Sequence, residues 1–142
     1  VMLAGKVLYG AGEEIIIDNA EKALKEACLA TNAQITEYTA APVYFGDNNT
    51  GAHEWFIEFV NEPDSIDKFT ELLDEGLKKA NSDYEAKRSY NLSLGLPIVH
   101  NLPKGTFNEW MKSIGKLGGQ NKVPRLSNNR DYVDRLSKFI EK

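Results

Sequence analysis

ITEYTAAPVYFGDNNTGAHEWFIEFV, residues 35–60, holds two extended runs on either side of a turn-forming segment. The runs at 35–45 and 52–60 are rich in the β-branched and aromatic residues that favour strands. Between them, GDNNTG contains aspartate, asparagine and glycine, which adopt turn conformations readily. The pattern therefore predicts an antiparallel hairpin.

Side chains in the second run alternate between apolar or aromatic on one face and acidic on the other. The first face carries His53, Trp55, Ile57 and Phe59, and the second carries Glu54 and Glu58. Because successive residues of a strand point to opposite faces of a sheet, we expect one buried face and one solvated face.

Before the hairpin, the sequence predicts a short strand and a helix. Residues 14–17, EIII, favour the strand, and Asp18 or Asn19 is placed to cap a helix that runs to about Thr31. Cys28 lies on the apolar face of this helix, which favours a buried residue over a nucleophile.

After the hairpin, a helix that begins at residues 63–64 shows the clearest apolar stripe in the chain. LPIVHNL at 96–102 predicts another strand. Thr106, with Glu109 three positions on, forms a capping box for a third helix. A last helix begins at about Asn129.

This order of elements predicts an α+β domain: a small, mainly antiparallel sheet with helices packed on one side. A chain of 142 residues is long enough for one domain with its own core. Residues 84–90 are ambiguous. Within them, Tyr84 and Arg88 are four positions apart and are either a helical contact or a surface patch.

The composition is that of an ordinary globular domain, with 42% hydrophobic and 27% charged residues. No apolar run approaches the roughly 20 residues needed to span a bilayer, so we expect a cytoplasmic protein with no membrane partner. A single cysteine excludes an internal disulfide. His53 and His100 lie far apart and no HExxH spacing occurs, so we expect no metal site.

Charge is distributed unevenly along the chain. Residues 1–103 carry 8 Lys/Arg against 17 Asp/Glu, whereas residues 104–142 carry 9 against 4. The overall net charge of −4 therefore conceals a basic C-terminal segment that could attract an anion.

GGQNKVPR at 118–125 lies in that basic segment and places Lys122 between two glycines and a proline. A lysine on a loop can neutralise a developing negative charge on phosphate. Arg125 could bind phosphate, or a carboxylate of another domain, through two hydrogen bonds, or it could satisfy nearby carbonyls. The alternative for the whole segment is a helix end followed by a solvated surface.

Nucleotide and hydrolase motifs are absent. The spacing around Lys122 does not match GxxxxGK[ST], and neither GxGxxG nor GxSxG occurs. Glu13 and Glu14 follow Gly12 and form either a turn or a hinge that absorbs backbone rotation.

Four segments, taken in order, resemble one known family: GEEIIIDNAEKAL at 12–24, ITEYTAAPVY at 35–44, YEAKR at 84–88 and GGQNKVPRL at 118–126. Together they are similar to the C-terminal domain of the auxin-responsive Gretchen Hagen acyl acid amido synthetases, especially bacterial members. That family is adenylate-forming. Its enzymes activate a carboxylic acid with ATP and pass the acyl group to an amine, usually that of an amino acid.

The resemblance implies that residues 1–142 are a single lid domain. Mg-ATP and the acid would be bound mainly by an N-terminal domain that this sequence does not contain. It further implies that Lys122 approaches the nucleotide phosphates during adenylation, and we place Gln120 and Arg125 with it as nucleotide-binding residues. Gly12, Glu13 and Glu14 would lie near the hinge on which the lid rotates.

The resemblance also implies that the isolated lid is inactive, with the N-terminal domain of the same polypeptide as its partner. The rival interpretation is a non-catalytic α+β module that binds an acidic partner or nucleic acid through the basic segment. A pI of about 5.2 argues against nucleic acid, and so does the lack of aromatic residues interleaved with the basic ones.

Overall fold

The predicted hairpin supplies two neighbouring strands of the main sheet. A computed structural model describes residues 7–9, 14–45, 50–89, 94–115 and 123–141. In it, β3 (Gln34–Phe45) and β4 (Thr50–Asn61) pair antiparallel, with Ala40 opposite Trp55. The later strand β5 (Ile98–Leu102) pairs parallel to β4, which gives the order β3-β4-β5. The sheet is mixed, and the predicted α+β class is confirmed.

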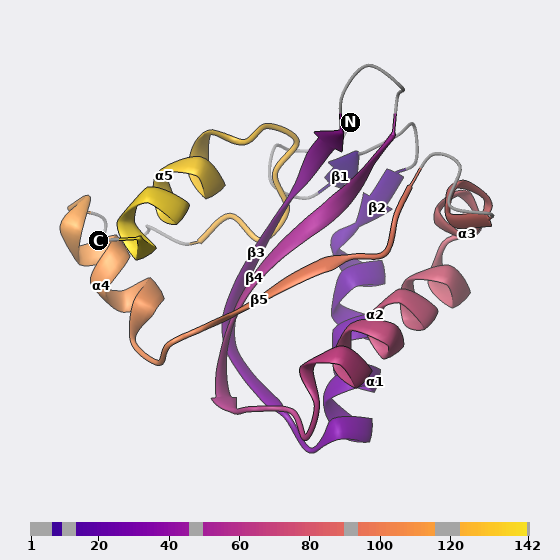
Figure 1. The fold of residues 1–142 in the computed structure, drawn as a ribbon, viewed down its shortest axis with the longest axis horizontal. Coiled ribbons are helices and arrows are strands. Elements are labelled where there is room, and N and C mark those ends of the chain that lie inside the picture. The colour runs from indigo at the N-terminus through magenta and orange to yellow at the C-terminus, as the bar shows by residue number, and fades with distance from the viewer. Residues whose placement is uncertain (1–6, 10–13, 46–49, 90–93, 116–122, 142) are drawn as a thin grey trace.

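Three helices cover one face of this sheet: α1 (Ile17–Thr31), α2 (Ile66–Ala80) and the short α3 (Ser82–Arg88) (Figure 1). The aromatic and apolar face of β4 points toward them, as predicted. The largest buried side chains in this core include Trp55, Phe59 and Phe69. The ambiguous residues 84–90 therefore begin within a helix, α3.

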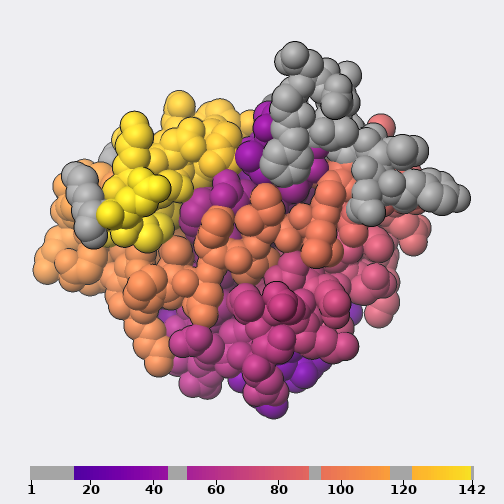
Figure 2. Space-filling view, in the orientation of Figure 1, coloured from indigo at the N-terminus to yellow at the C-terminus, as the bar shows by residue number. Residues whose placement is uncertain are grey.

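Two more helices, α4 (Thr106–Ser113) and α5 (Asp131–Ile140), lie against the opposite face (Figure 1). The expected solvated face, with helices on one side only, is therefore wrong. Phe56 and Leu102 point to this side and form a second core with aromatic side chains such as Trp110. In the space-filling view, orange residues around β5 separate the yellow C-terminal residues from the magenta residues below (Figure 2).

Glu58 shows why an acid can lie on that covered face. Its side chain is buried, and its carboxylate oxygens accept hydrogen bonds from the backbone N–H groups of Gly105 (3.0 Å) and Phe107 (2.9 Å). A carboxylate at this position satisfies unpaired donors at the start of α4. The predicted capping box of Thr106 and Glu109 is wrong, because Thr106 donates instead to the carbonyl of Pro103.

The predicted cap of α1 is also displaced. The helix begins at Ile17, so Asp18 and Asn19 lie within its first turn. The Asn19 side chain reaches back to accept from the N–H of Ile16 (3.1 Å) and donates to the carbonyl of Ala80 (3.2 Å). Asn19 thus joins the start of α1 to the end of α2.

A separate two-stranded sheet precedes α1. It pairs β1 (Val7–Tyr9) with β2 (Glu14–Ile16) antiparallel, and Tyr9 lies opposite Glu14. The strand at 14–17 was predicted, whereas β1 was not.

Candidate functional site

Residues 123–127, which follow the GGQNK sequence, lie along the edge of β3 that faces away from β4. The N–H of Ala40 donates to the carbonyl of Arg125 (2.9 Å), and the N–H of Ser127 donates to the carbonyl of Ala40 (3.0 Å). The hydroxyl of Thr39 donates to the carbonyl of Pro124 (2.5 Å). Leu126 is fully buried in the first core. The chain immediately after Lys122 is therefore fixed to the sheet.

The Arg125 side chain leaves this segment on the side of α1. Its Nη1 donates to Glu21 (2.7 Å) on α1, and its Nε donates to Glu37 (3.1 Å) on β3. The guanidinium carbon lies 5.4 Å from the ring centre of Tyr38, whose hydroxyl donates to Glu21 (3.1 Å). We call Arg125, Glu21, Glu37 and Tyr38 the Arg125 cluster. Burial, and after it the charge of Glu21, raise the pKa of Tyr38, which therefore remains a neutral donor.

A shallow cavity of about 300 Å³ adjoins the Arg125 cluster. Lys25 and Arg125 line it together with the carboxylates of Glu21 and Glu37, so its charges balance. Such a lining offers no net attraction for a polyphosphate, so this cavity does not by itself form an ATP site. Cys28 also lines the cavity, and burial raises the pKa of its thiol. The thiol therefore has little thiolate character. Cys28 packs against the first core but is only half-buried, so the expectation of a buried residue is met in part.

Of the other predicted site residues, the structure describes only Glu14. Lys122, Gln120, Gly12 and Glu13 lie outside the described residues. Glu14 begins β2, directly after the segment that joins the paired strands β1 and β2.

The family model for the GH3 family C-terminal domain matches residues 18–131. This chain belongs to the GH3 family. The match takes in the hairpin, nearly all of α1, the helices α2, α3 and α4, and the segment that carries Lys122, and it ends where α5 begins.

Solved structures show the same fold as this GH3 domain. A "GH3.15 acyl acid amido synthetase" is 19% identical, with a TM-score of 0.72 over 96% of this chain. A structure titled "AtGH3.15 acyl acid amido synthetase in complex with 2,4-DB" is 18% identical, with a TM-score of 0.70 over 89% of this chain. The alignments cover 24% of each of those chains, so the GH3 domain spans about a quarter of their length. No curated protein sequence matched.

Tyr84 and Arg88 of the YEAKR segment meet at one buried acid of the GH3 domain, Asp74 on α2. Arg88 donates to both Asp74 oxygens, from Nε at 2.8 Å and from Nη2 at 2.9 Å. The Tyr84 hydroxyl donates to Oδ1 at 2.6 Å. Arg88 also donates to the carbonyl of Leu94 (3.1 Å). The pair left undecided in the sequence is thus an internal network that fastens α3 to α2.

Two arginines of the basic C-terminal segment, Arg125 and Arg130, are paired with acids of the rest of the domain. Arg130 donates to Glu54 (2.8 Å) on β4 and to the carbonyl of Pro42 (3.0 Å). Glu54 also lies 2.6 Å from Nε2 of His100. The hydrogen bond with His100, and after it that from Arg130, hold the pKa of Glu54 below its ordinary value. The arginines at 125 and 130 therefore do not form an open basic surface.

Among the described residues, no group of three or more His, Cys, Asp or Glu side chains is arranged to hold a metal ion. Within the same part of the chain, no helix is long and apolar enough to cross a membrane.

Sequence reasoning missed Glu21, Glu37, Tyr38 and Asp74. Residues 21, 37 and 125 are far apart in the chain, and no fixed spacing links them. The single local signal for Asp74 was an acid within the apolar stripe of α2, which indicates a buried partner for a cation.

Proposed function

We propose that this chain is the C-terminal lid domain of an ATP-dependent acyl acid amido synthetase. Residues 1–142 would form a single domain, and the domain that binds ATP and the acid would lie elsewhere in the same polypeptide. The family match over residues 18–131 carries this proposal. Solved structures titled acyl acid amido synthetases, of which the chain spans about a quarter, support it.

In the proposed reaction, ATP supplies the adenylyl group. A carboxylate oxygen of the acid bonds to the α-phosphorus as pyrophosphate leaves, and an amine, such as that of an amino acid, then displaces AMP and loses a proton. The role proposed for Lys122 is to place a positive charge beside the phosphates in the first half-reaction, with Gln120 as a neighbouring polar contact. We assign Arg125, three residues after Lys122, to the same region of the lid.

The proposal also assigns Gly12, Glu13 and Glu14 to the hinge between the two domains. This segment precedes residue 18, where the family match begins. A hinge there would let the lid turn between the adenylation and aminolysis steps without disturbing its own core.

The test of the proposal is Lys122→Ala in the full-length enzyme. Loss of one preorganised cation should lower adenylation, measured as ATP–pyrophosphate exchange, by roughly 100-fold or more. Aminolysis of a supplied acyl adenylate should be spared, because that step does not involve the leaving pyrophosphate.

Lys112→Ala is the matched control, because it removes one positive charge from an exposed position on α4, ten residues earlier in the chain. It should leave both steps unchanged. Normal pyrophosphate exchange in Lys122→Ala would exclude the assigned role of this lysine.

A further inference from the structure

Arg125 lies three residues after Lys122, on a segment whose backbone is bonded to β3 on both sides of it. The carbonyls of Pro124 and Arg125 and the N–H of Ser127 all bind residues 39–40. The side chain extends from the same point and bridges Glu21 on α1 to Glu37 on β3. Arg125 therefore joins the chain that follows Lys122 to both the sheet and the helical layer.

We propose that Arg125, held by Glu21 and Glu37, is a positioning residue. It fixes the chain just after Lys122 and so limits where this lysine can reach the phosphates. This inference rests on the proposed role of Lys122 and adds two acids and an arginine that act through it.

Chain geometry explains why such a fixed point is useful. Three residues span at most roughly 11 Å, so a fixed Arg125 limits the volume that the Lys122 backbone can sample. Pro124, between them, has a restricted φ and removes part of the remaining freedom. A displacement of about 1 Å at a reacting centre can lower a rate roughly 100-fold. A chain that moved freely just after Lys122 would therefore lower the catalytic rate.

The surroundings of Arg125 favour this role over direct phosphate binding. Two carboxylates already take its Nε and Nη1 donors, and a third oxygen, that of Tyr38, binds Glu21 in turn. A phosphate approaching this guanidinium would also approach Glu21 and Glu37, which are negatively charged. Their repulsion opposes nucleotide binding at this point.

The experiment compares Arg125→Ala with the double variant Glu21→Gln/Glu37→Gln in the full-length enzyme. The double variant leaves the arginine in place and removes only the charges that hold it. If Arg125 positions Lys122, both variants should lower kcat for pyrophosphate exchange roughly 10-fold or more, with little change in KM for ATP. Arg125→Lys should fall between Arg125→Ala and wild type, because an ammonium lacks the planar fork that reaches both acids.

Two further measurements separate positioning from loss of folding. The ion pairs are partly exposed, with 43% of the Arg125 side chain and 45% of that of Glu21 accessible. The thermal midpoint should therefore shift by no more than about 3 °C. Amide hydrogen exchange should quicken at Ala40 and Ser127, whose N–H groups hold the segment on β3. Arg135→Ala, at an exposed position on α5, is the control and should change none of these quantities.

A rise in KM for ATP in Arg125→Ala, with normal kinetics in the double variant, would show direct nucleotide contact and overturn the inference. Normal kinetics in both variants would overturn it as well. Either result can occur while Lys122→Ala still lowers exchange, so the role of Lys122 is judged separately. Unchanged hydrogen exchange at Ala40 and Ser127 would also count against the inference.

Discussion

Asp74 is a charged residue in the interior of the domain. Its side chain is 5% exposed and that of Arg88 is 9% exposed. Burial opposes ionisation, but the hydrogen bonds from Arg88 and Tyr84 outweigh it and hold the pKa of Asp74 below its ordinary value. Removing only one partner of a buried ion pair of this kind strongly destabilises the folded protein.

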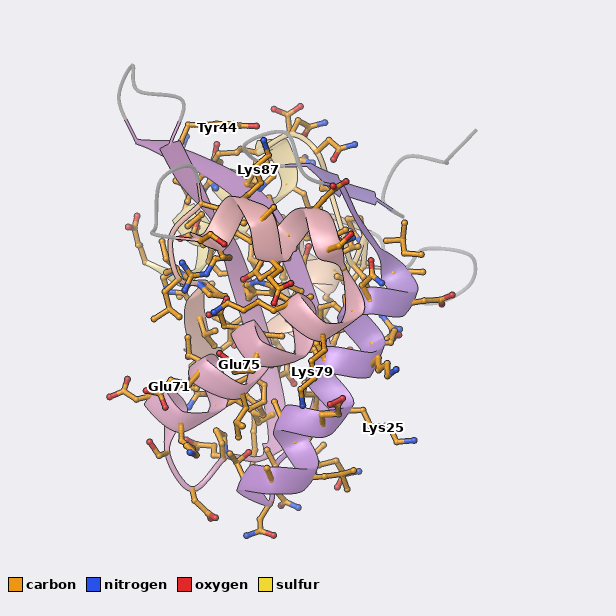
Figure 3. All side chains as sticks on the ribbon, turned by 90° about the vertical axis from the view of Figure 1, so that its right-hand side faces the viewer. Lys25, Tyr44, Glu71, Glu75, Lys79 and Lys87 are labelled. Atoms are coloured by element: carbon orange, nitrogen blue, oxygen red, sulfur yellow. The ribbon has the colours of Figure 1, made fainter. Side chains whose placement is uncertain are left out.

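We therefore expect Arg88→Ala to lower the free energy of unfolding by about 3–5 kcal/mol, because it leaves the Asp74 carboxylate buried without its main partner. Tyr84→Phe removes one hydrogen bond to a charged group and should cost about 1.5–3 kcal/mol. Urea unfolding of the 142-residue chain at pH 7 measures both. Glu71→Gln, at an exposed position on the same helix (Figure 3), should stay within about 0.5 kcal/mol of wild type.

The sign of the pH dependence follows from the lowered pKa of Asp74. The stability that the Asp74 charge contributes is fully present above its unfolded pKa, about 3.9, and is lost as pH falls through the lower folded value. The unfolding free energy of wild type should therefore fall below about pH 4 more steeply than that of Asp74→Asn. Parallel curves for the two proteins would contradict this account of the network.

At the scale of elements, α1 and α2 approach each other so closely that one position has room only for glycine. A Cβ atom on Gly76 would lie 2.9 Å from both Cα and Cβ of Ala23 on α1. Periodicity predicted both helices and the buried face of α2. It did not predict this crossing, because glycine within a helix is unfavourable by propensity alone.

Gly76→Ala should therefore destabilise the chain, although alanine is the better helix former by about 1 kcal/mol. Overpacking typically costs about 1–3 kcal/mol, which should exceed that gain. The measurement is a double-mutant cycle with Ala23→Gly, followed by urea unfolding. Because the second change removes one of the two close contacts, Gly76→Ala should be less harmful in that background, with a coupling of at least about 0.5 kcal/mol. Additive effects, or a more stable Gly76→Ala, would disprove the tight crossing.

The start of α4 shows the same limit of local reasoning. Thr106 and Glu109 have the spacing of a capping box, yet Glu58 on β4 takes that role. Glu58 reaches the helix because β4 and the end of β5 are paired, with Glu58 opposite Leu102. Local spacing cannot reveal a competitor that lies about 50 residues away in the chain.

At the scale of the whole molecule, the surface carries both signs of charge. The outer side of α1 and α2 carries Lys25, Glu71, Glu75 and Lys79 (Figure 3). In the C-terminal segment, Arg125 and Arg130 are paired with acids from α1, β3 and β4. Among the described residues, these two arginines therefore do not contribute to a continuous basic surface of the kind that nucleic acid requires.

The 142-residue chain should accordingly show no binding to a single-stranded oligonucleotide tighter than about 10⁻⁴ M at physiological salt. Fluorescence titration at low and at physiological salt measures this. The 142-residue chain should also catalyse no pyrophosphate exchange by itself, since the proposed function places the ATP site in another domain. Tight binding that weakens steeply with added salt would instead favour the rival module.

The sequence by itself determined the hairpin, the helix α2, the α+β class and the family resemblance, because these depend on local periodicity, turn residues and short ordered motifs. Tertiary structure alone decided that both faces of the sheet are covered, that Glu58 caps α4, and that Arg125 joins Glu21 to Glu37. Each of these depends on side chains brought together from distant segments. Their contact energies arise only when the sheet forms, so no spacing in the chain records them.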